Sequence, residues 1–203
     1  MIRYAITDRK LLAVDEPARR AALLALASLW AAEHIDYIQL REKDLPAAEL
    51  KQLARAINGI LCEAGAATKL LINRHADISL AANAGVHLTT APGQPTLAEI
   101  RELFASSSRP QPVISISCHT LKEVSYARHE QVDLILFGPV FGKTIAGVEV
   151  VPATGLEALK LACEAAGDIP VLALGGITEE NTAECLAAGA AGIAGIRLFA
   201  GSI

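Results

Sequence analysis

The sequence has few aromatic residues and no surplus of basic ones. Phe, Trp and Tyr make up 4% of the chain, and 18 Lys and Arg residues stand against 22 Asp and Glu, for a net charge of −4. The concentrated positive charge of a nucleic-acid-binding domain is therefore missing. No apolar run reaches the ~20 residues of a membrane helix, and the opening MIRYAITDRK lacks the apolar core of a signal peptide. We expect a cytoplasmic protein that has neither a nucleic acid nor a membrane as its partner.

Cysteine is also scarce, and its spacing carries information. The four cysteines form no Cys-x-x-Cys pair and lie far apart, at Cys62, Cys118, Cys163 and Cys185. This spacing argues against a zinc site and against a disulfide framework. It fits reduced thiols that fill small apolar spaces in the core.

Short apolar runs alternate along the chain with longer stretches rich in Ala and Leu. Hydrophobic residues form 52% of the 203 residues, enough for one domain with a substantial core. Eight runs predict β-strands, at Ile2–Thr7, Asp36–Arg41, Lys69–Ile72, Gly85–Leu88, Val113–Ser117, Asp133–Phe137, Pro170–Leu174 and Ala191–Ile196. The stretches between them predict helices, at Glu16–Ala32, Ala47–Ala64, Ala76–Ala84, Leu97–Ser106, Leu121–His129, Thr154–Ala166 and Glu179–Ala188.

Strands that alternate with helices through short links indicate a parallel sheet. Eight of them indicate an α/β fold of the (β/α)8 TIM-barrel type, which would span residues 1–203 as a single domain. The chain is short for this fold, which typically has ~250 residues. Only residues 197–203 follow the last strand, so we expect the final helix to be reduced or missing. We expect another copy of the chain to cover that side in a homo-oligomer.

Polar side chains alternate along the end of the second strand. With a period of two, Gln39, Arg41 and Lys43 share one face, while Ile38 and Leu40 face the helices. Active sites of TIM barrels lie at the carboxyl ends of the strands. A guanidinium and an ammonium group that converge there suit a phosphate or a carboxylate. The alternative is a solvated strand end with ion pairs inside the barrel.

The fifth strand ends in a similar pattern. Ser115, Ser117 and His119 share one face, and His119 lies just beyond the strand end. An imidazole accepts and returns a proton near neutral pH, so His119 is a candidate for proton transfer. The alternative is a histidine that caps the next helix or is satisfied by hydrogen bonds in the loop. Asn73, after the third strand, is placed to hydrogen-bond a heteroaromatic ligand. His87, on the fourth strand, is a weaker candidate that lines the barrel.

Glycines end the last two strands. Gly175 and Gly176 follow the seventh strand, and Gly195, Ile196 and Arg197 lie at the end of the eighth. Glycine lets the backbone approach a ligand closely, and TIM barrels often bind phosphate at the loops after these two strands. The alternative is a pair of tight packing turns.

The loop that follows the sixth strand covers residues 138–147. Its length and its three glycines are typical of a mobile lid. Within it, Lys143 and Thr144 are placed to close over a bound anion.

Together these motifs resemble the thiamine phosphate synthase/TenI superfamily, in the same order and over nearly the whole chain. The matching segments are AITDRK, YIQLREKDL, LLINRHADISLAANAGVHL, ISISCHTLKEV, DLILFGPVFG, PVLALGGITEEN and GAAGIAGI. The resemblance implies a thiamine-pathway barrel that binds a phosphorylated thiazole. It also implies that Gly176, Ile196 and Arg197 meet the thiazole phosphate, the first two through backbone N–H groups. Arg197 stands where the family usually has a small hydroxyl residue.

The superfamily has two main activities. The synthase couples a pyrimidine diphosphate to the thiazole phosphate with Mg²⁺, whereas the TenI group includes a thiazole tautomerase that aromatises a carboxythiazole phosphate without a metal. This chain departs from the synthase pattern, because Arg74 replaces an acidic Mg²⁺ ligand and residues 88–94 contain no acid. In the lid, Gly142 and Ala146 replace residues of the synthase pattern.

These departures favour the tautomerase, with no cofactor and no metal. His119 matches the histidine to which the TenI group's proton transfer is assigned, and we expect Arg41 and Lys43 to hold the substrate's carboxylate. The rest of the expected substrate site is formed by Gln39, Asn73, Ser117 and Thr144. Two alternatives remain open: a divergent Mg²⁺-dependent thiamine phosphate synthase, and a non-catalytic protein that binds thiazole or thiamine phosphates.

Overall fold

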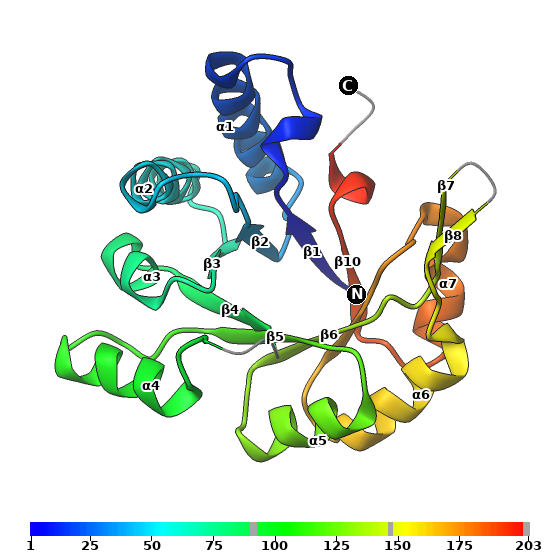
Figure 1. Ribbon diagram of the computed structural model, residues 1–203. Coiled ribbons are helices and arrows are strands. Elements are labelled where there is room, and N and C mark those ends of the chain that lie inside the picture. The colour runs from blue at the N-terminus through cyan, green and yellow to red at the C-terminus, as the bar shows by residue number, and fades with distance from the viewer. Residues whose placement is uncertain (90–92, 146–147, 201–203) are drawn as a thin grey trace.

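Eight parallel strands close into a barrel that is surrounded by helices (Figure 1). The computed structural model describes residues 1–89, 93–145 and 148–200, and for residues 143–145 and 148–151 it describes the backbone alone. Around the barrel the strands follow the order β1-β10-β9-β6-β5-β4-β3-β2. The (β/α)8 TIM-barrel fold predicted from the sequence is confirmed.

The elements lie close to their predicted positions. The barrel strands are β1 (Ile2–Ile6), β2 (Tyr37–Leu40), β3 (Lys69–Asn73), β4 (Gly85–Thr89), β5 (Ile114–Cys118), β6 (Leu134–Phe137), β9 (Val171–Leu174) and β10 (Gly192–Gly195). The helices are α1 (Glu16–Ala32), α2 (Ala47–Glu63), α3 (Ala76–Ala82), α4 (Leu97–Ser106), α5 (Leu121–His129), α6 (Gly155–Ala166) and α7 (Glu179–Ala187). Thr96, Thr120 and Thr178 begin α4, α5 and α7 with capping boxes, which explains why these three boundaries are easy to predict.

Alternation along each strand separates two apolar layers. Ile38 and Leu40 on β2 point outward and are buried against α1 and α2, as their spacing predicts. Tyr4, Leu71 and Leu136 point inward and belong to the cluster that fills the barrel. Polar side chains share this interior, and because they are buried they must find hydrogen-bond partners there.

The segment after β6 differs from the sequence-based expectation. A glycine-rich loop was expected over residues 138–147, but the chain forms an antiparallel ribbon of β7 (Lys143–Ile145) and β8 (Val148–Val151). The ribbon stands beside α6 and α7 in Figure 1. Its residues are rich in Val, Ile and Thr, whose branched side chains favour strands, and this preference outweighs the flanking glycines. Ala146 lies outside the described residues.

A short 3-10 helix, η2 (Arg197–Phe199), follows β10 in the described chain. It lies next to β10 on the side of the barrel that α1 also borders (Figure 1). The indole N–H of Trp30 donates to the carbonyl of Phe199 at 2.9 Å, and Phe199 and Ala200 pack on the core under α1. Among the described helices, none is both long and apolar enough to cross a membrane.

Candidate active site at the barrel mouth

Two buried amides face each other inside the barrel near the ends of β2 and β3. The amide nitrogen of Gln39 donates to the side-chain oxygen of Asn73 at 3.0 Å. The side-chain oxygen of Gln39 is buried and accepts no hydrogen bond within the described chain. A buried acceptor without a donor is costly, so this atom suits a ligand that brings an N–H or O–H group. The structure thus brings together the two amides that the sequence placed on this face.

A hydrogen-bonded chain crosses the barrel beside these amides. Nδ1 of His87 lies 2.8 Å from the hydroxyl of Ser115, and Nε2 lies 3.0 Å from that of Ser117. The Tyr4 hydroxyl lies 3.0 Å from the same Ser115 hydroxyl. Burial, assisted by the charge of Arg41, lowers the pKa of His87 to about 3. His87 is therefore neutral at pH 7 and orients Ser117 rather than exchanging protons.

His119 lies at the rim, just after β5. Its Nδ1 contacts the backbone carbonyl of Gly138, which follows the neighbouring strand β6. A carbonyl oxygen only accepts, so Nδ1 is the donor in this contact, and Nε2 is the ring nitrogen that the contact does not engage. Thr120, not His119, caps α5, because the Thr120 hydroxyl accepts the backbone N–H of Glu123. Thr120 therefore takes the capping role, and the contact with Gly138 is the kind of hydrogen bond that a histidine satisfied in the loop would make. The role of His119 in proton transfer stays a prediction, and its side chain is exposed.

Three basic side chains gather at the ends of β2 and β3. Arg41 and Arg74 follow strands that pair in register, with Leu40 opposite Ile72. The charge of Arg41, then partial burial, and the charge of Arg74 lower the pKa of Lys43, so the three cations lie near enough to repel one another. Within the described residues, no carboxylate forms an ion pair with any of them.

Within the described chain, the ion pairs of this region centre on Arg9, in the turn that follows β1, and none involves Arg41 or Lys43. Arg9, which is 3% exposed, binds Glu42 at 2.9 Å, Asp44 at 2.8 Å and Glu16 at 2.9 Å. Arg9 follows β1 and lies in the 3-10 turn η1 (Arg9–Leu11). Sequence reasoning did not single out Arg9. The available signal was the alternation of sign from Arg41 to Asp44, which places acids and bases on opposite sides of an extended segment.

The described residues near the mouth form no three-ligand cluster for a cation. Across the described ranges, no group of three or more His, Cys, Asp or Glu side chains is placed to hold a metal ion. The two nearest carboxylates on the β2 loop, Glu42 and Asp44, are bound by Arg9, which holds the pKa of Asp44 well below its usual range. Arg74, with a left-handed backbone (φ 70°), occupies the position after β3. This set of side chains suits an anion.

The glycines after β9 make close contacts with the segment after β6. A Cβ on Gly175 would lie 2.5 Å from Pro139 Cβ, and one on Gly176 would lie 2.7 Å from Phe141 Cβ. Both have positive φ, 94° and 66°, so only glycine fits without strain. Tight packing at the turn therefore accounts for their geometry. The binding of a phosphate by the backbones of Gly175 and Gly176 stays a proposal.

The remaining predicted residues lie at the end of β10 and in the ribbon. Gly195 and Ile196 are partly buried, and Arg197 is exposed at the start of η2. Thr144 belongs to β7, next to Lys143, and its side chain lies outside what the structure describes.

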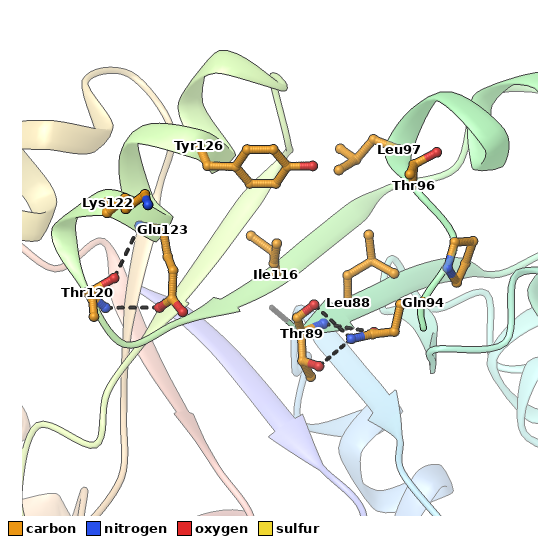
Figure 2. A pocket seen from close by; sticks show the side chains of 11 residues that line it. Leu88, Thr89, Gln94, Thr96, Leu97, Ile116, Thr120, Lys122, Glu123 and Tyr126 are labelled. Carbon is orange, nitrogen blue, oxygen red and sulfur yellow. Dashed lines mark hydrogen bonds between the residues drawn. The ribbon is translucent and has the colours of Figure 1, made fainter. Parts of the chain in front are cut away.

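A separate groove of about 520 Å³ lies in the helix layer, between α4 and α5 (Figure 2). Figure 2 shows Leu88 and Ile116 at its floor, with Tyr126 and Leu97 on opposite sides. The residues predicted from the sequence to form the site do not line this groove. It is distinct from the mouth, because Leu88 and Ile116 point outward, into the core between barrel and helices.

Fold and mouth together define a TIM-barrel protein whose strand ends carry basic side chains, an oriented histidine and buried amides. Comparison with known proteins places it more closely. A family model described as thiamine monophosphate synthase matches residues 3–199. The chain belongs to this family, the thiamine monophosphate synthase/TenI family of thiamine biosynthesis. The resemblance seen in the sequence motifs is confirmed.

Relatives and solved structures agree with the family match. The chain is 42% identical to a putative thiamine-phosphate synthase of Geobacter sulfurreducens, over 94% of this chain and 83% of that protein. It is 37% identical to putative thiamine-phosphate synthase 2 of Aquifex aeolicus, over 97% and 96% of the two chains. The structure of a thiamine phosphate pyrophosphorylase from Pyrococcus furiosus superimposes with a TM-score of 0.77, at 27% identity, over 99% of this chain and 88% of that one.

Proposed function

We propose that this protein is a thiazole tautomerase that works without a metal ion. Its substrate would be a phosphorylated dihydrothiazole that carries a carboxylate and an exocyclic alkylidene group. His119 takes a proton from the ring, and an acid returns one to the neighbouring side-chain carbon. The ring becomes aromatic, which supplies the driving force, so the site needs only to stabilise the anionic transition state.

One observation carries this proposal: the basic cluster of Arg41, Lys43 and Arg74 has no carboxylate partner in the described chain. A substrate carboxylate would balance this charge directly. A Mg²⁺–diphosphate complex would bring a second cation to a position where Arg74 already stands. The preference for a metal-free substrate therefore depends on Arg74, which stands where the synthase pattern has an acidic residue, and not on the net charge of the ligand, since a diphosphate would also balance three cations.

The orientation of His119 supports its role as the base. The contact of Nδ1–H with the Gly138 carbonyl leaves Nε2 to accept a proton, and the ring is exposed at the rim. Gln39, Asn73 and Ser117 would line the ring-binding part of the site. Because His87 holds Ser117 from below, this hydroxyl is oriented before substrate arrives.

The phosphate would bind at the ends of β9 and β10, opposite the basic cluster. We assign it to the backbones of Gly175, Gly176, Gly195 and Ile196, with Arg197 adding charge. At these strand ends the backbone N–H groups can approach an anion closely, because glycine has no side chain to obstruct it. Thr144 on the ribbon would close over the substrate.

The experiment follows product formation by NMR from the dihydrothiazole carboxylate phosphate. One sample contains EDTA, a second contains Mg²⁺, and a third adds the pyrimidine diphosphate with Mg²⁺. If the sample with protein and EDTA forms the aromatic product faster than buffer without protein, the tautomerase is supported. Thiamine phosphate formed only with Mg²⁺ would overturn it in favour of the synthase. Binding of the thiazole phosphate without either product would favour a non-catalytic binding protein.

The second candidate is thiamine phosphate synthase, and the names of the relatives favour it. The two relatives described above, and others such as that of Moorella thermoacetica, carry the synthase name. The buried Gln39 oxygen that lacks a donor also suits a pyrimidine with an exocyclic amino group. Against it stands Arg74, since the synthase reaction needs a cation to neutralise the diphosphate leaving group.

A further inference from the structure

The segment that leaves β2 carries charges of alternating sign, and the fold separates them. Glu42 and Asp44 turn toward β1, where both bind Arg9. Arg41 and Lys43 carry no carboxylate partner in the described chain and lie near Arg74. Four consecutive charges are thereby sorted, with the acids on one side and the bases on the other.

Arg9 is built into the fold as the centre of this arrangement. Its guanidinium is 3% exposed and the Glu42 carboxylate 2% exposed, so their 2.9 Å ion pair is shielded from solvent. Two nitrogens of Arg9 reach the two oxygens of Asp44, at 2.8 and 3.1 Å, a bidentate pair that fixes direction as well as distance. A third nitrogen binds Glu16 on α1.

A hydroxyl joins this ion-pair cluster to the backbone of the basic side. The Thr7 hydroxyl donates to Glu42 at 2.6 Å and accepts the backbone N–H of Arg41 at 2.9 Å. The same Thr7 hydroxyl therefore orients both the Glu42 carboxylate and the backbone of Arg41.

Loss of the guanidinium would leave Glu42 as a buried charge that is held, among the described residues, only by the Thr7 hydroxyl and the Arg9 backbone N–H. It would leave Asp44 with its exposed ion pair to Lys10 at 3.1 Å. Arg41 and Lys43 flank Glu42 in the chain and are the cations for which it would then compete with a ligand.

We propose that Arg9 is a positioning residue for the anion site: it holds Glu42 and Asp44 away from the mouth and so keeps Arg41 and Lys43 available to an anionic ligand. The inference deepens the proposed function and rests on its anion site, but not on the reaction. The ligand class is a small phosphate or carboxylate that binds through charge. The role is separate from catalysis, since Arg9 is buried and bound by carboxylates on every side the structure describes.

Calorimetric titration with inorganic pyrophosphate in EDTA tests this, because it measures anion binding without turnover. We expect Arg9→Met to weaken binding at least about tenfold, as freed carboxylates compete for the cations. The triple variant Arg9→Met, Glu42→Gln, Asp44→Asn should recover affinity to within about threefold of the parent, because the competing charges are gone although the ion pairs remain broken. A purely structural role of Arg9 predicts no such recovery.

The matched control is Arg20→Met. Arg20 also binds two carboxylates, Glu16 and Glu49, but neither flanks the basic residues, so its loss should leave pyrophosphate affinity unchanged. Arg41→Gln should abolish pyrophosphate binding, which would show that the probe binds at the basic cluster. Unchanged affinity in folded Arg9→Met, or no recovery in the triple variant, would overturn the proposal.

If Arg9→Met fails to fold, Asp44→Asn gives the decisive measurement, since this side chain is 40% exposed. Loss of its charge should preserve or raise affinity, and a tenfold loss would contradict the inference. Failure of the tautomerase assay would leave all these results standing, so the two proposals fail separately.

Discussion

Two histidines show how strongly position decides the chemistry of a side chain. His87 is buried between hydroxyls, and burial keeps it neutral. His119, just past the end of the neighbouring strand, is exposed and oriented by a single carbonyl. The His87 imidazole is thus a buried hydrogen-bonding group, whereas the His119 imidazole lies at the rim, where we propose that it transfers a proton.

At this scale we expect His119→Ala to lower kcat of the tautomerase at least about tenfold, because positioned proton transfer typically contributes 10²–10⁴-fold. The ring is exposed, so the free energy of unfolding should change little. Steady-state kinetics and urea unfolding of the same samples check both statements. His129→Ala, on the exposed surface of α5, is the control and should retain full activity. A kcat equal to that of the parent would remove His119 from the mechanism.

The lowered pKa of His87 predicts that the free energy of unfolding decreases in acid. Its pKa of about 3 in the folded protein lies below the ordinary value of 6.5, so between these values the unfolded chain binds a proton that the folded chain does not. The contribution of His87 to the free energy of unfolding is therefore fully present above pH 6.5. It is lost as the pH falls toward 3, with a slope of up to about 1.4 kcal/mol per pH unit.

Urea unfolding between pH 7.5 and 4.5 measures this slope. In His87→Asn the slope should flatten over that range, whatever the variant's stability at pH 7.5. Asp44, whose pKa is lowered by Arg9, loses its contribution below its ordinary value of 3.8, outside the measured range. An unchanged slope in the variant would show that His87 does not cause the acid sensitivity.

At the scale of elements, barrel closure depends on a contact between the first and last strands. A Cβ on Gly192 of β10 would lie 2.0 Å from the carbonyl oxygen of Ile2 on β1, a backbone atom that cannot move easily. We expect Gly192→Ala to destabilise the protein by about 3 kcal/mol or more, through strain at the closing seam.

Gly59 provides the matched comparison. It lies inside α2, and a Cβ added there would have no heavy atom within 4 Å, so Gly59→Ala should stabilise by about 0.5–1 kcal/mol through helix propensity. Chemical denaturation of the two variants measures both changes in the free energy of unfolding, which should have opposite signs. Equal effects would mean that the seam contact has no special cost.

The same scale explains what sequence patterns predict well and where they fail. The strands and helices follow periods of two and 3.6, which a single sequence displays, and Thr96, Thr120 and Thr178 mark helix starts by local chemistry. The sequence pattern predicts a loop where the structure has the ribbon of β7 and β8. Strands of three and four residues are too short to show a period, and neither strand alone indicates that the two pair.

At the scale of the whole molecule, the expected homo-oligomer stays a prediction. The 3-10 helix η2 lies on the side between β10 and α1, with Phe199 and Ala200 packed on the core there. We expect a second copy of the chain to cover this side. Light scattering at micromolar concentration measures the mass, and a monomer would contradict the expectation.

The sequence by itself determined the barrel, the family and the faces on which the polar residues lie, because alternation and helical periodicity are local properties of the chain. Placement of Gln39, Asn73 and Ser117 in one interior followed from parity alone. Only the tertiary structure decided which charges meet. Arg9 is separated from Glu42 and Asp44 by more than thirty residues of sequence, and their pairing exists because β1 and β2 lie side by side. Long-range contacts of this kind, rather than residue types, decide which charged side chains pair with one another.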